Sequence, residues 1–196
     1  MKDKFLNSSI NFINKYGNYS DKDIKKLRYG LEGLYLTWTK VIFITFISIV
    51  LGIIKEVLII LLLFNFLRFF GFGFHAEKSS HCLILSTLIF VIIPYIFLQL
   101  TITTKTFFLV SIFCLINILF FAPADTKKRP LRNRKKRIIR KILNLIVATS
   151  YITVGLVLNN NYINTLILVS LLIEVFVIIP TTYKVFKQPY NNYKNS

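Results

Sequence analysis

Long apolar runs separated by short polar segments dominate the chain from residue 34 onwards. A helix needs about 20 predominantly apolar residues to cross a bilayer, so we interpret the runs as membrane-spanning helices. The six predicted spans cover residues 34–54, 57–67, 83–100, 106–122, 142–158 and 163–182. The second run is the shortest, and a tilted, a re-entrant or a protein-buried helix would each accommodate it.

Residues 1–33 have a different pattern, in which single apolar residues are mixed with Lys and Asn. Ser20 followed by Asp21 and Asp23 predicts the start of a helix. This pattern favours amphipathic helices lying on the anionic inner leaflet. A basic solubilising tail is the alternative interpretation.

Composition supports a lipid environment. Hydrophobic residues make up 55% of the 196-residue chain and charged residues only 17%, against about 25% charged in typical soluble domains. The net charge of +17 resembles that of a nucleic-acid-binding protein. However, the charges are confined to segments between apolar runs, so we expect no nucleic-acid partner. The fold class predicted is an all-α integral membrane protein with six transmembrane helices.

The distribution of basic residues predicts the orientation in the membrane. Ten Lys or Arg residues fall within 123–141, and basic loops stay in the cytoplasm. Alternation then places both termini inside, with all 25 basic residues on that side except Lys40, Lys55 and Lys105. We therefore expect a cytoplasmic amphipathic segment at 1–33, a membrane domain at 34–182 with a basic loop at 123–141, and a cytoplasmic tail at 183–196.

Reactive side chains concentrate in residues 68–82, which contain both histidines and one of the two cysteines. Cys82 with His75 is a candidate nucleophile and base. On one straight helix they would lie about 10 Å apart, so the backbone must break between them. A helix starting at Ser79–Ser80 would place Cys82 in its first turn, where the positive helix end favours a thiolate.

Other interpretations of these residues remain open. Cys82 can be an inert thiol, and a metal site built from His75, Glu77, His81 and Cys82 has acceptable ligand types. Cys114 lies mid-span and is predicted to be a packing residue. Glu174 also lies within a span, where an acid points to pairing or function; it can pair with Lys40 or lie beside an aqueous cavity.

Two segments resemble one known family. Arg68, Gly71, Gly73, His75–Ala76 and a Cys seven residues after the His resemble the active-site segment of the accessory gene regulator B (AgrB) family, staphylococcal type. The sequence Phe-Ala-Pro-Ala-Asp-Thr-Lys-Lys-Arg-Pro-Leu at 121–131 is similar to that family's segment after the fourth span. Chain length, six spans and basic cytoplasmic segments also match.

The resemblance implies a cysteine endopeptidase of quorum sensing in the bacterial cell membrane. It implies His75 and Cys82 as catalytic residues, no cofactor, a homodimer, and an AgrD-like propeptide that is cleaved and cyclised to a thiolactone. The acidic part of that substrate would be attracted by basic residues, which we predict to be Arg68, Lys127, Lys128, Arg129, Lys135, Lys136 and Arg137. The alternative function is a non-enzymatic transporter or peptide-exporter subunit, with Glu174, Lys40 and Arg68 lining a path.

Overall fold

The computed structural model describes residues 2–17, 19–74, 79–126 and 130–194. Within these ranges the regular elements are all helical, and Phe72 and Ala124 form an isolated β-bridge. The predicted all-α class is therefore confirmed. The chain divides into two units, residues 1–47 and residues 48–196.

The first unit is a pair of helices. It contains α1 (Lys2–Tyr16) and most of α2 (Asp21–Val50). The two helices meet where the rings of Phe5 and Tyr35 lie 5.4 Å apart. The predicted helix start is confirmed, because the Ser20 hydroxyl accepts a hydrogen bond of 3.3 Å from the Asp23 amide, as an N-cap does. From there α2 continues without a break through residue 33.

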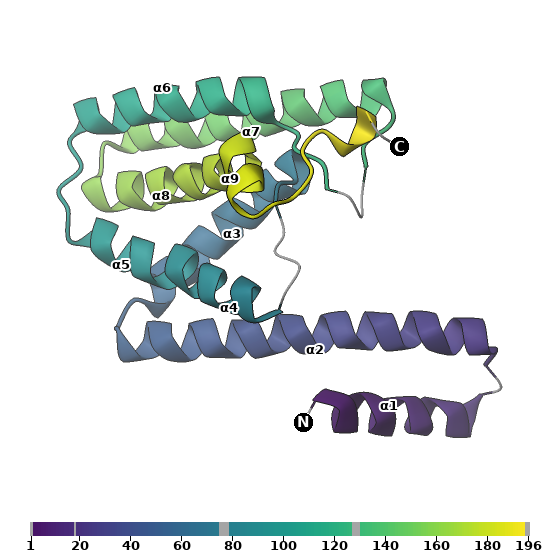
Figure 1. Ribbon diagram of the computed structural model, residues 1–196. Coiled ribbons are helices and arrows are strands. Elements are labelled where there is room, and N and C mark those ends of the chain that lie inside the picture. The colour runs from purple at the N-terminus through teal and green to yellow at the C-terminus, as the bar shows by residue number, and fades with distance from the viewer. Residues whose placement is uncertain (1, 18, 75–78, 127–129, 195–196) are drawn as a thin grey trace. The chain divides into compact units, whose positions relative to one another are not determined.

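The second unit is a bundle built around one buried helix. Its elements are α3 (Ile54–Gly71), α4 (Ser79–Thr87), a π-helical turn (Leu88–Ile92), α5 (Ile93–Leu98), α6 (Thr104–Phe121), α7 (Arg134–Leu158), α8 (Asn161–Ile178), α9 (Pro180–Val185) and a 3₁₀ turn (Asn192–Lys194). Helix α8 runs through the middle, with α3, α5, α6 and α7 packed against it (Figure 1).

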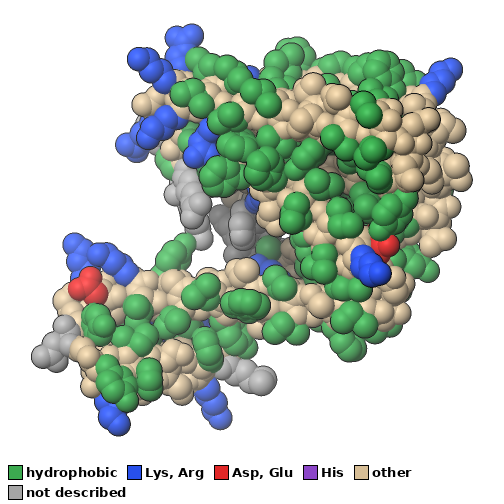
Figure 2. Space-filling view, turned by 180° about the vertical axis from the view of Figure 1, so that it is seen from behind, with side chains coloured by type: hydrophobic (Ala, Val, Ile, Leu, Met, Phe, Trp, Pro, Cys, Tyr) green, Lys and Arg blue, Asp and Glu red, His purple; other side chains and the backbone are tan. Residues whose placement is uncertain are grey.

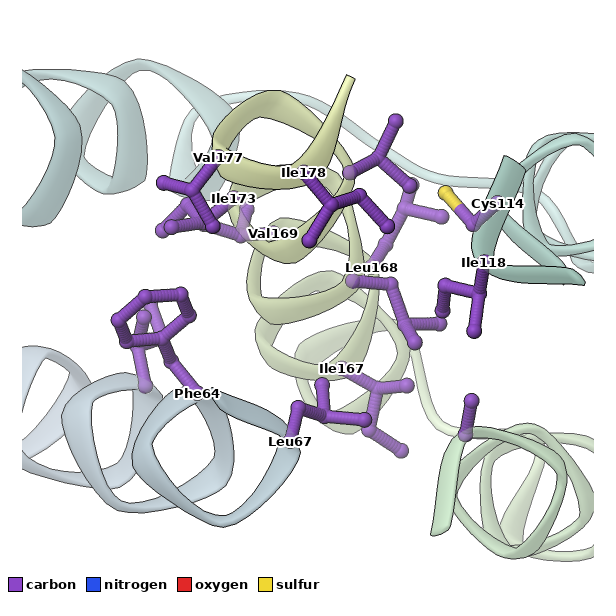
Figure 3. Close-up of a cluster of buried hydrophobic side chains, with 14 of the residues drawn as sticks. Phe64, Leu67, Cys114, Ile118, Ile167, Leu168, Val169, Ile173, Val177 and Ile178 are labelled. Carbon is purple, nitrogen blue, oxygen red and sulfur yellow. The ribbon is translucent and has the colours of Figure 1, made fainter. Parts of the chain in front are cut away.

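The core of this unit is formed where α8 meets its neighbours. Phe64 and Leu67 of α3 point towards α8 from one side, and Cys114 and Ile118 of α6 from another (Figure 3). Leu168 of α8 lies among them and is buried. The thiol of Cys114 is part of this apolar packing, as its mid-span position predicts.

Two of the helix boundaries that differ from the predicted spans have a clear local cause. Helix α7 begins at Arg134, within the predicted basic loop, because the Asn133 side chain accepts a hydrogen bond of 3.2 Å from the Lys136 amide and caps the helix. The loop is thus shorter than predicted. Helix α8 ends at Ile178, because Pro180 lacks an N–H and keeps the preceding residue extended.

Among the residues that the structure describes, four helices are long and apolar enough to cross a membrane, which fits a multi-pass membrane protein. They are α2, α6, α7 and α8. The predicted third span corresponds to a shorter apolar helix at Cys82–Leu98. The predicted second span lies in α3, an 18-residue helix that carries Lys55, Glu56 and Arg68.

Candidate functional site

The segment after α3 is held in place by backbone hydrogen bonds to two distant parts of the chain. The Gly73 amide donates to the Ala124 carbonyl over 2.8 Å, and the Ala124 amide donates to the Gly71 carbonyl over 2.9 Å. The Phe74 amide donates to the Val177 carbonyl, at the end of α8, over 2.7 Å. The two sequence segments singled out above, around residues 71 and 124, therefore lie side by side in the structure.

Glycine is required at two positions of this segment. A Cβ atom at Gly71 would lie 1.9 Å from Glu174 Oε1 and 2.4 Å from Asn144 Nδ2. Gly73 has a φ angle of 107°, and its Cβ would meet the Val177 carbonyl oxygen at 2.9 Å. Glycine adopts such a positive φ angle without strain, so Gly73 permits the chain to turn here. Gly71 instead ends α3 against a pair of buried polar side chains.

That buried pair consists of Glu174 on α8 and Asn144 on α7. The Asn144 Nδ2 atom donates to Glu174 Oε1 over 3.2 Å, and both side chains are fully buried. The structure thus gives Glu174 a neutral hydrogen-bond partner directly beneath the end of α3. Burying a carboxyl group is costly without such partners, so the hydrogen bond from Asn144 offsets part of the cost of burying Glu174.

Arg68 links the buried acid to the candidate site. Its guanidinium donates to the Phe74 carbonyl over 2.9 Å and lies 5.4 Å from the centre of the Phe64 ring. The same guanidinium is close enough to interact electrostatically with both Glu174 and Cys82. Sequence analysis predicts Arg68 as a substrate contact. In the structure it holds the backbone at Phe74 and contributes positive potential near the thiol.

Cys82 is the fourth residue of α4, which begins at Ser79. Ser79 is also the first residue described after residue 74. In α4 as described, Cys82 thus lies in the first turn, where backbone N–H groups have no helical acceptor. Its side chain is partly exposed, and its Sγ lies 4.0 Å from Ser86 Oγ one turn further on. No disulfide joins Cys82 to Cys114, which is buried.

Several predicted site residues lie outside the described part of the chain. They are His75, Glu77, Lys127, Lys128 and Arg129. The pairing of His75 with Cys82, and the metal-site alternative that includes His75 and Glu77, thus stay predictions. Among the described residues, no cluster of three or more His, Cys, Asp or Glu side chains could hold a metal ion.

The remaining predicted basic residues lie on the first turns of α7. Lys135 and Lys136 are exposed to solvent, whereas the Arg137 guanidinium lies 3.4 Å from the centre of the Tyr193 ring. Arg140, one turn further on, donates to the Phe69 carbonyl over 2.9 Å. Lys and Arg side chains gather at this end of the molecule, beside a face covered by hydrophobic side chains (Figure 2).

Comparison with known proteins identifies the family. The family model described as accessory gene regulator B matches residues 6–178, which is most of the chain. The chain belongs to the accessory gene regulator B family. That family acts with the AgrD propeptide in the agr quorum-sensing system, so this member has a role in that system.

Individual relatives agree with this assignment. An AgrB-like protein of Clostridium acetobutylicum is 32% identical over 92% of this chain and 87% of its own length. An AgrB-like protein of Listeria monocytogenes is 32% identical over 86% of this chain and 83% of its own length. Accessory gene regulator protein B of Staphylococcus intermedius is 28% identical over 83% of this chain and 86% of its own length. No solved structure matches the chain.

Within this AgrB-family chain, the C-terminal segment is the part of the site that sequence analysis misses. It is predicted only as a cytoplasmic tail. In the structure the Tyr183 hydroxyl donates to the Asp125 carbonyl over 3.2 Å, and the Asn192 amide donates to Asp125 Oδ1 over 2.9 Å. The ring of Phe186 stacks on that of Phe74 at 4.6 Å. The sequence feature that could have predicted this packing is the number of aromatic residues in the tail, namely Tyr183, Phe186, Tyr190 and Tyr193. A terminus surrounded by solvent rarely contains so many.

The docked tyrosines are neutral hydrogen-bond donors. Burial raises the pKa of Tyr183 well above its usual range, and burial raises the pKa of Tyr190 to about 12. The hydroxyl of Tyr190 donates to the Phe121 carbonyl over 3.4 Å. Both side chains therefore stay protonated at any physiological pH, and the tail remains fastened beside residues 121–125.

Proposed function

We propose that the protein is a membrane cysteine endopeptidase that cleaves the C-terminal part of an AgrD-like propeptide, with Cys82 as nucleophile and His75 as base. The observation that carries this proposal is the position of Cys82 in the first turn of α4, within electrostatic range of the Arg68 guanidinium. Orphan N–H groups of a helix start and a nearby cation both favour the thiolate over the thiol. Membership in the AgrB family supplies the substrate class.

The reaction begins with transfer of the Cys82 thiol proton to His75. The thiolate attacks the carbonyl carbon of the scissile peptide bond and forms a tetrahedral intermediate. As the C–N bond breaks, His75 returns the proton to the departing amine, and the N-terminal part of the propeptide stays bound to Cys82 as a thioester. The N–H groups at the start of α4 are candidate donors to the oxyanion.

Release of the product uses a second thiol. A cysteine of the propeptide attacks the Cys82 thioester and takes over the acyl group, which yields a thiolactone. One thioester replaces another, so the exchange has little net cost, whereas water would release the linear acid irreversibly. A site that excludes water favours the cyclic product, and Phe74, buried next to the candidate base, is suited to that task.

Purified protein in liposomes, incubated with candidate AgrD-like propeptides, tests the proposal directly. Mass spectrometry should show loss of the C-terminal segment and, after trapping, an acyl adduct whose mass maps to the peptide containing Cys82. Cleavage without an adduct on Cys82 would exclude covalent catalysis by this residue.

We further propose that six segments cross the membrane with both termini in the cytoplasm, since this arrangement places nearly all basic residues on one side. Single cysteines at Thr103, Pro130, Asn160 and Lys194, in a background lacking Cys82 and Cys114, should separate into two groups. An impermeant thiol reagent added to intact cells should label positions 103 and 160 only. Labelling of position 130 or 194 from outside would exclude the six-span topology.

The exposed basic turns of α7 should contribute to substrate capture by long-range attraction. Replacing Lys135, Lys136 and Arg137 by Gln should weaken propeptide binding about three- to tenfold at low salt. The loss should shrink at high salt, because the Debye length falls to about 3 Å at 1 M and already removes the attraction. Binding of a fluorescent propeptide to reconstituted protein measures the effect.

The matched control for this experiment removes charge elsewhere. Lys184 and Lys187 are also exposed but lie on the C-terminal segment, and their replacement by Gln should change the affinity less than the α7 variant does. Equal losses from both variants would mean that only the net charge matters. If the α7 variant binds the propeptide with unchanged affinity at low salt, its basic residues only determine the orientation of the chain in the membrane.

A further inference from the structure

A pocket of about 240 Å³ opens where α6 ends and α7 begins. Its basic wall is formed by α7, its apolar wall by the end of α6, and its third wall by the docked C-terminal segment with Tyr190 and Tyr193. The hydrogen bonds of Tyr190 to the Phe121 carbonyl and of the Asn192 amide to Asp125 fix this third wall. The pocket is therefore bounded by anchored elements on all three sides.

Three cations line the pocket from one helix face. Arg134, Arg137 and Lys141 are spaced three and four residues apart, which places them on the same side of α7. None of them forms an ion pair with an acidic side chain in the part of the chain that the structure describes. The stacking of Arg137 on Tyr193 orients its guanidinium without neutralising it. Three cations on one helix face, without an acidic partner among the described residues, favour binding of an anion.

One wall of the pocket is apolar and continues into exposed hydrophobic side chains of α6 and α7. Phe120 and Ile138 both line the pocket, and their side chains are 70% and 49% exposed. One turn beyond Ile138, Ile142 begins the strongly apolar part of α7. The pocket thus lies at the border between the basic turns and the hydrophobic span, which is the level of the lipid headgroups.

We propose that this pocket binds the phosphate-bearing headgroup of an anionic phospholipid. Arg134, Arg137 and Lys141 would contact the phosphate, and the acyl chains would lie against Phe120 and Ile138. The volume is below the roughly 300–1,000 Å³ of sites for drug-sized ligands, so it suits one headgroup better than a peptide segment. A free phosphate would leave the exposed apolar wall uncovered.

Occupancy of the pocket would reinforce the candidate site next to it. Pro123 lines the pocket, and the adjacent Ala124 forms the two backbone hydrogen bonds that hold Gly71 and Gly73. A lipid bound there would fix both Pro123 and the C-terminal segment. The binding event itself does not depend on the proposed peptidase activity, so its test uses binding and not cleavage.

The test measures lipid binding to the purified full chain in an uncharged detergent. Native mass spectrometry, during titration with phosphatidylglycerol, should show one bound lipid that phosphatidylcholine does not match. The double variant Arg134→Gln/Lys141→Gln should bind phosphatidylglycerol at least about tenfold more weakly, because two charge-assisted contacts are lost. The charge-retaining variant Arg134→Lys/Lys141→Arg should stay within about threefold of the unmodified chain.

The control Lys135→Gln/Lys136→Gln removes the same charge from the start of the same helix, but neither residue lines the pocket. It should weaken binding by less than about threefold. Circular dichroism and a melting curve for each variant separate loss of the site from loss of the fold; should the double variant misfold, the single variant Arg134→Gln should still bind at least threefold more weakly.

Three results would overturn the proposal. If the pocket and control variants lose equal affinity for phosphatidylglycerol, the lipid is attracted by the overall positive charge and not by a specific site. Binding of glycerol 3-phosphate as tight as that of phosphatidylglycerol would show a site for free phosphate. An acidic peptide that displaces the lipid and binds more tightly would show a peptide site instead.

Discussion

Cleavage of the propeptide should be abolished when Cys82 is replaced by alanine. Loss of a catalytic nucleophile lowers turnover by many orders of magnitude in other peptidases, and we expect a fall of at least about 10³-fold here. The other cysteine cannot substitute, because Cys114 is buried in the core between α6 and α8. The measurement is the rate of C-terminal segment release by purified protein in liposomes.

Two further replacements separate the parts of this mechanism. Cys82→Ser should be nearly as inactive, since a hydroxyl is far less ionised and its ester is a poorer donor to the substrate thiol. His75→Ala should lower the rate about 10²- to 10⁴-fold. That loss should be partly recovered at raised pH, because hydroxide then deprotonates the thiol without the base.

The controls are the remaining residues of the same types. Cys114→Ala and His81→Ala should keep most of the activity, and an electrophile should modify Cys82 faster than Cys114. If the Cys82→Ala protein still cleaves its propeptide after reconstitution, Cys82 is not the nucleophile. If a Cys82 variant still secretes its peptide fully, the exporter alternative is favoured. The structure gives that alternative little support at Glu174, because this side chain is buried and hydrogen bonded to Asn144.

The local elements of the candidate site could be predicted from sequence because they depend on local chemistry. Ser20 and Ser79 stand where polar residues give way to helix, and helices start at or next to both. The apolar runs placed α6 and the helix at 82–98 within a few residues. The end of α8 was missed because apolar character continues past Ile178, whereas Pro180 breaks the hydrogen-bond ladder.

The tertiary contacts of the site could not be predicted in this way. Nothing in the sequence says that Gly71 faces Glu174, more than 100 residues away, or that Ala124 pairs with the backbone of Gly71 and Gly73. Such pairings depend on how four helices pack, and periodicity is uninformative for helices that are apolar on every side. Sequence alone predicts that Arg68 attracts the acidic part of the substrate, and it gives no sign of the hydrogen bond from Arg68 to the Phe74 carbonyl.

Gly71→Ala should impair both stability and cleavage. The added Cβ would lie 1.9 Å from Glu174 Oε1 and 2.4 Å from Asn144 Nδ2, so α3 must shift away from α7 and α8. Overpacking of this kind costs about 1–3 kcal/mol. The shift would also displace the segment that leads to His75, and a misplacement of about 1 Å can lower catalysis about 10²-fold. Melting curves and cleavage rates of the reconstituted variant measure the two effects.

Two other glycines provide the controls for this prediction. A Cβ at Gly33 meets nothing within 4 Å, so Gly33→Ala should be neutral or stabilise its helix by up to about 1 kcal/mol. A Cβ at Gly155 would lie 2.5 Å from Phe107 Cζ and 2.7 Å from Asn164 Oδ1. Asn164 is about 15 Å from Glu174 along α8, so Gly155→Ala should destabilise the fold without a comparable loss of activity per folded molecule.

A double substitution tests whether the contact with Glu174 is the cause. Gly71→Ala/Glu174→Ala creates room for the new Cβ and should melt at a higher temperature than Gly71→Ala/Glu174→Gln, in which the side chain keeps its length. Both double variants lose the carboxylate, but only Gln keeps a group that can pair with Asn144. The melting temperatures of Glu174→Ala and Glu174→Gln in the chain with Gly71 are therefore measured as well, and their difference is subtracted to complete the coupling cycle. If the two melt at the same temperature after this subtraction, or if Gly71→Ala by itself keeps full stability and activity, then α3 does not end against Glu174 as the structure shows.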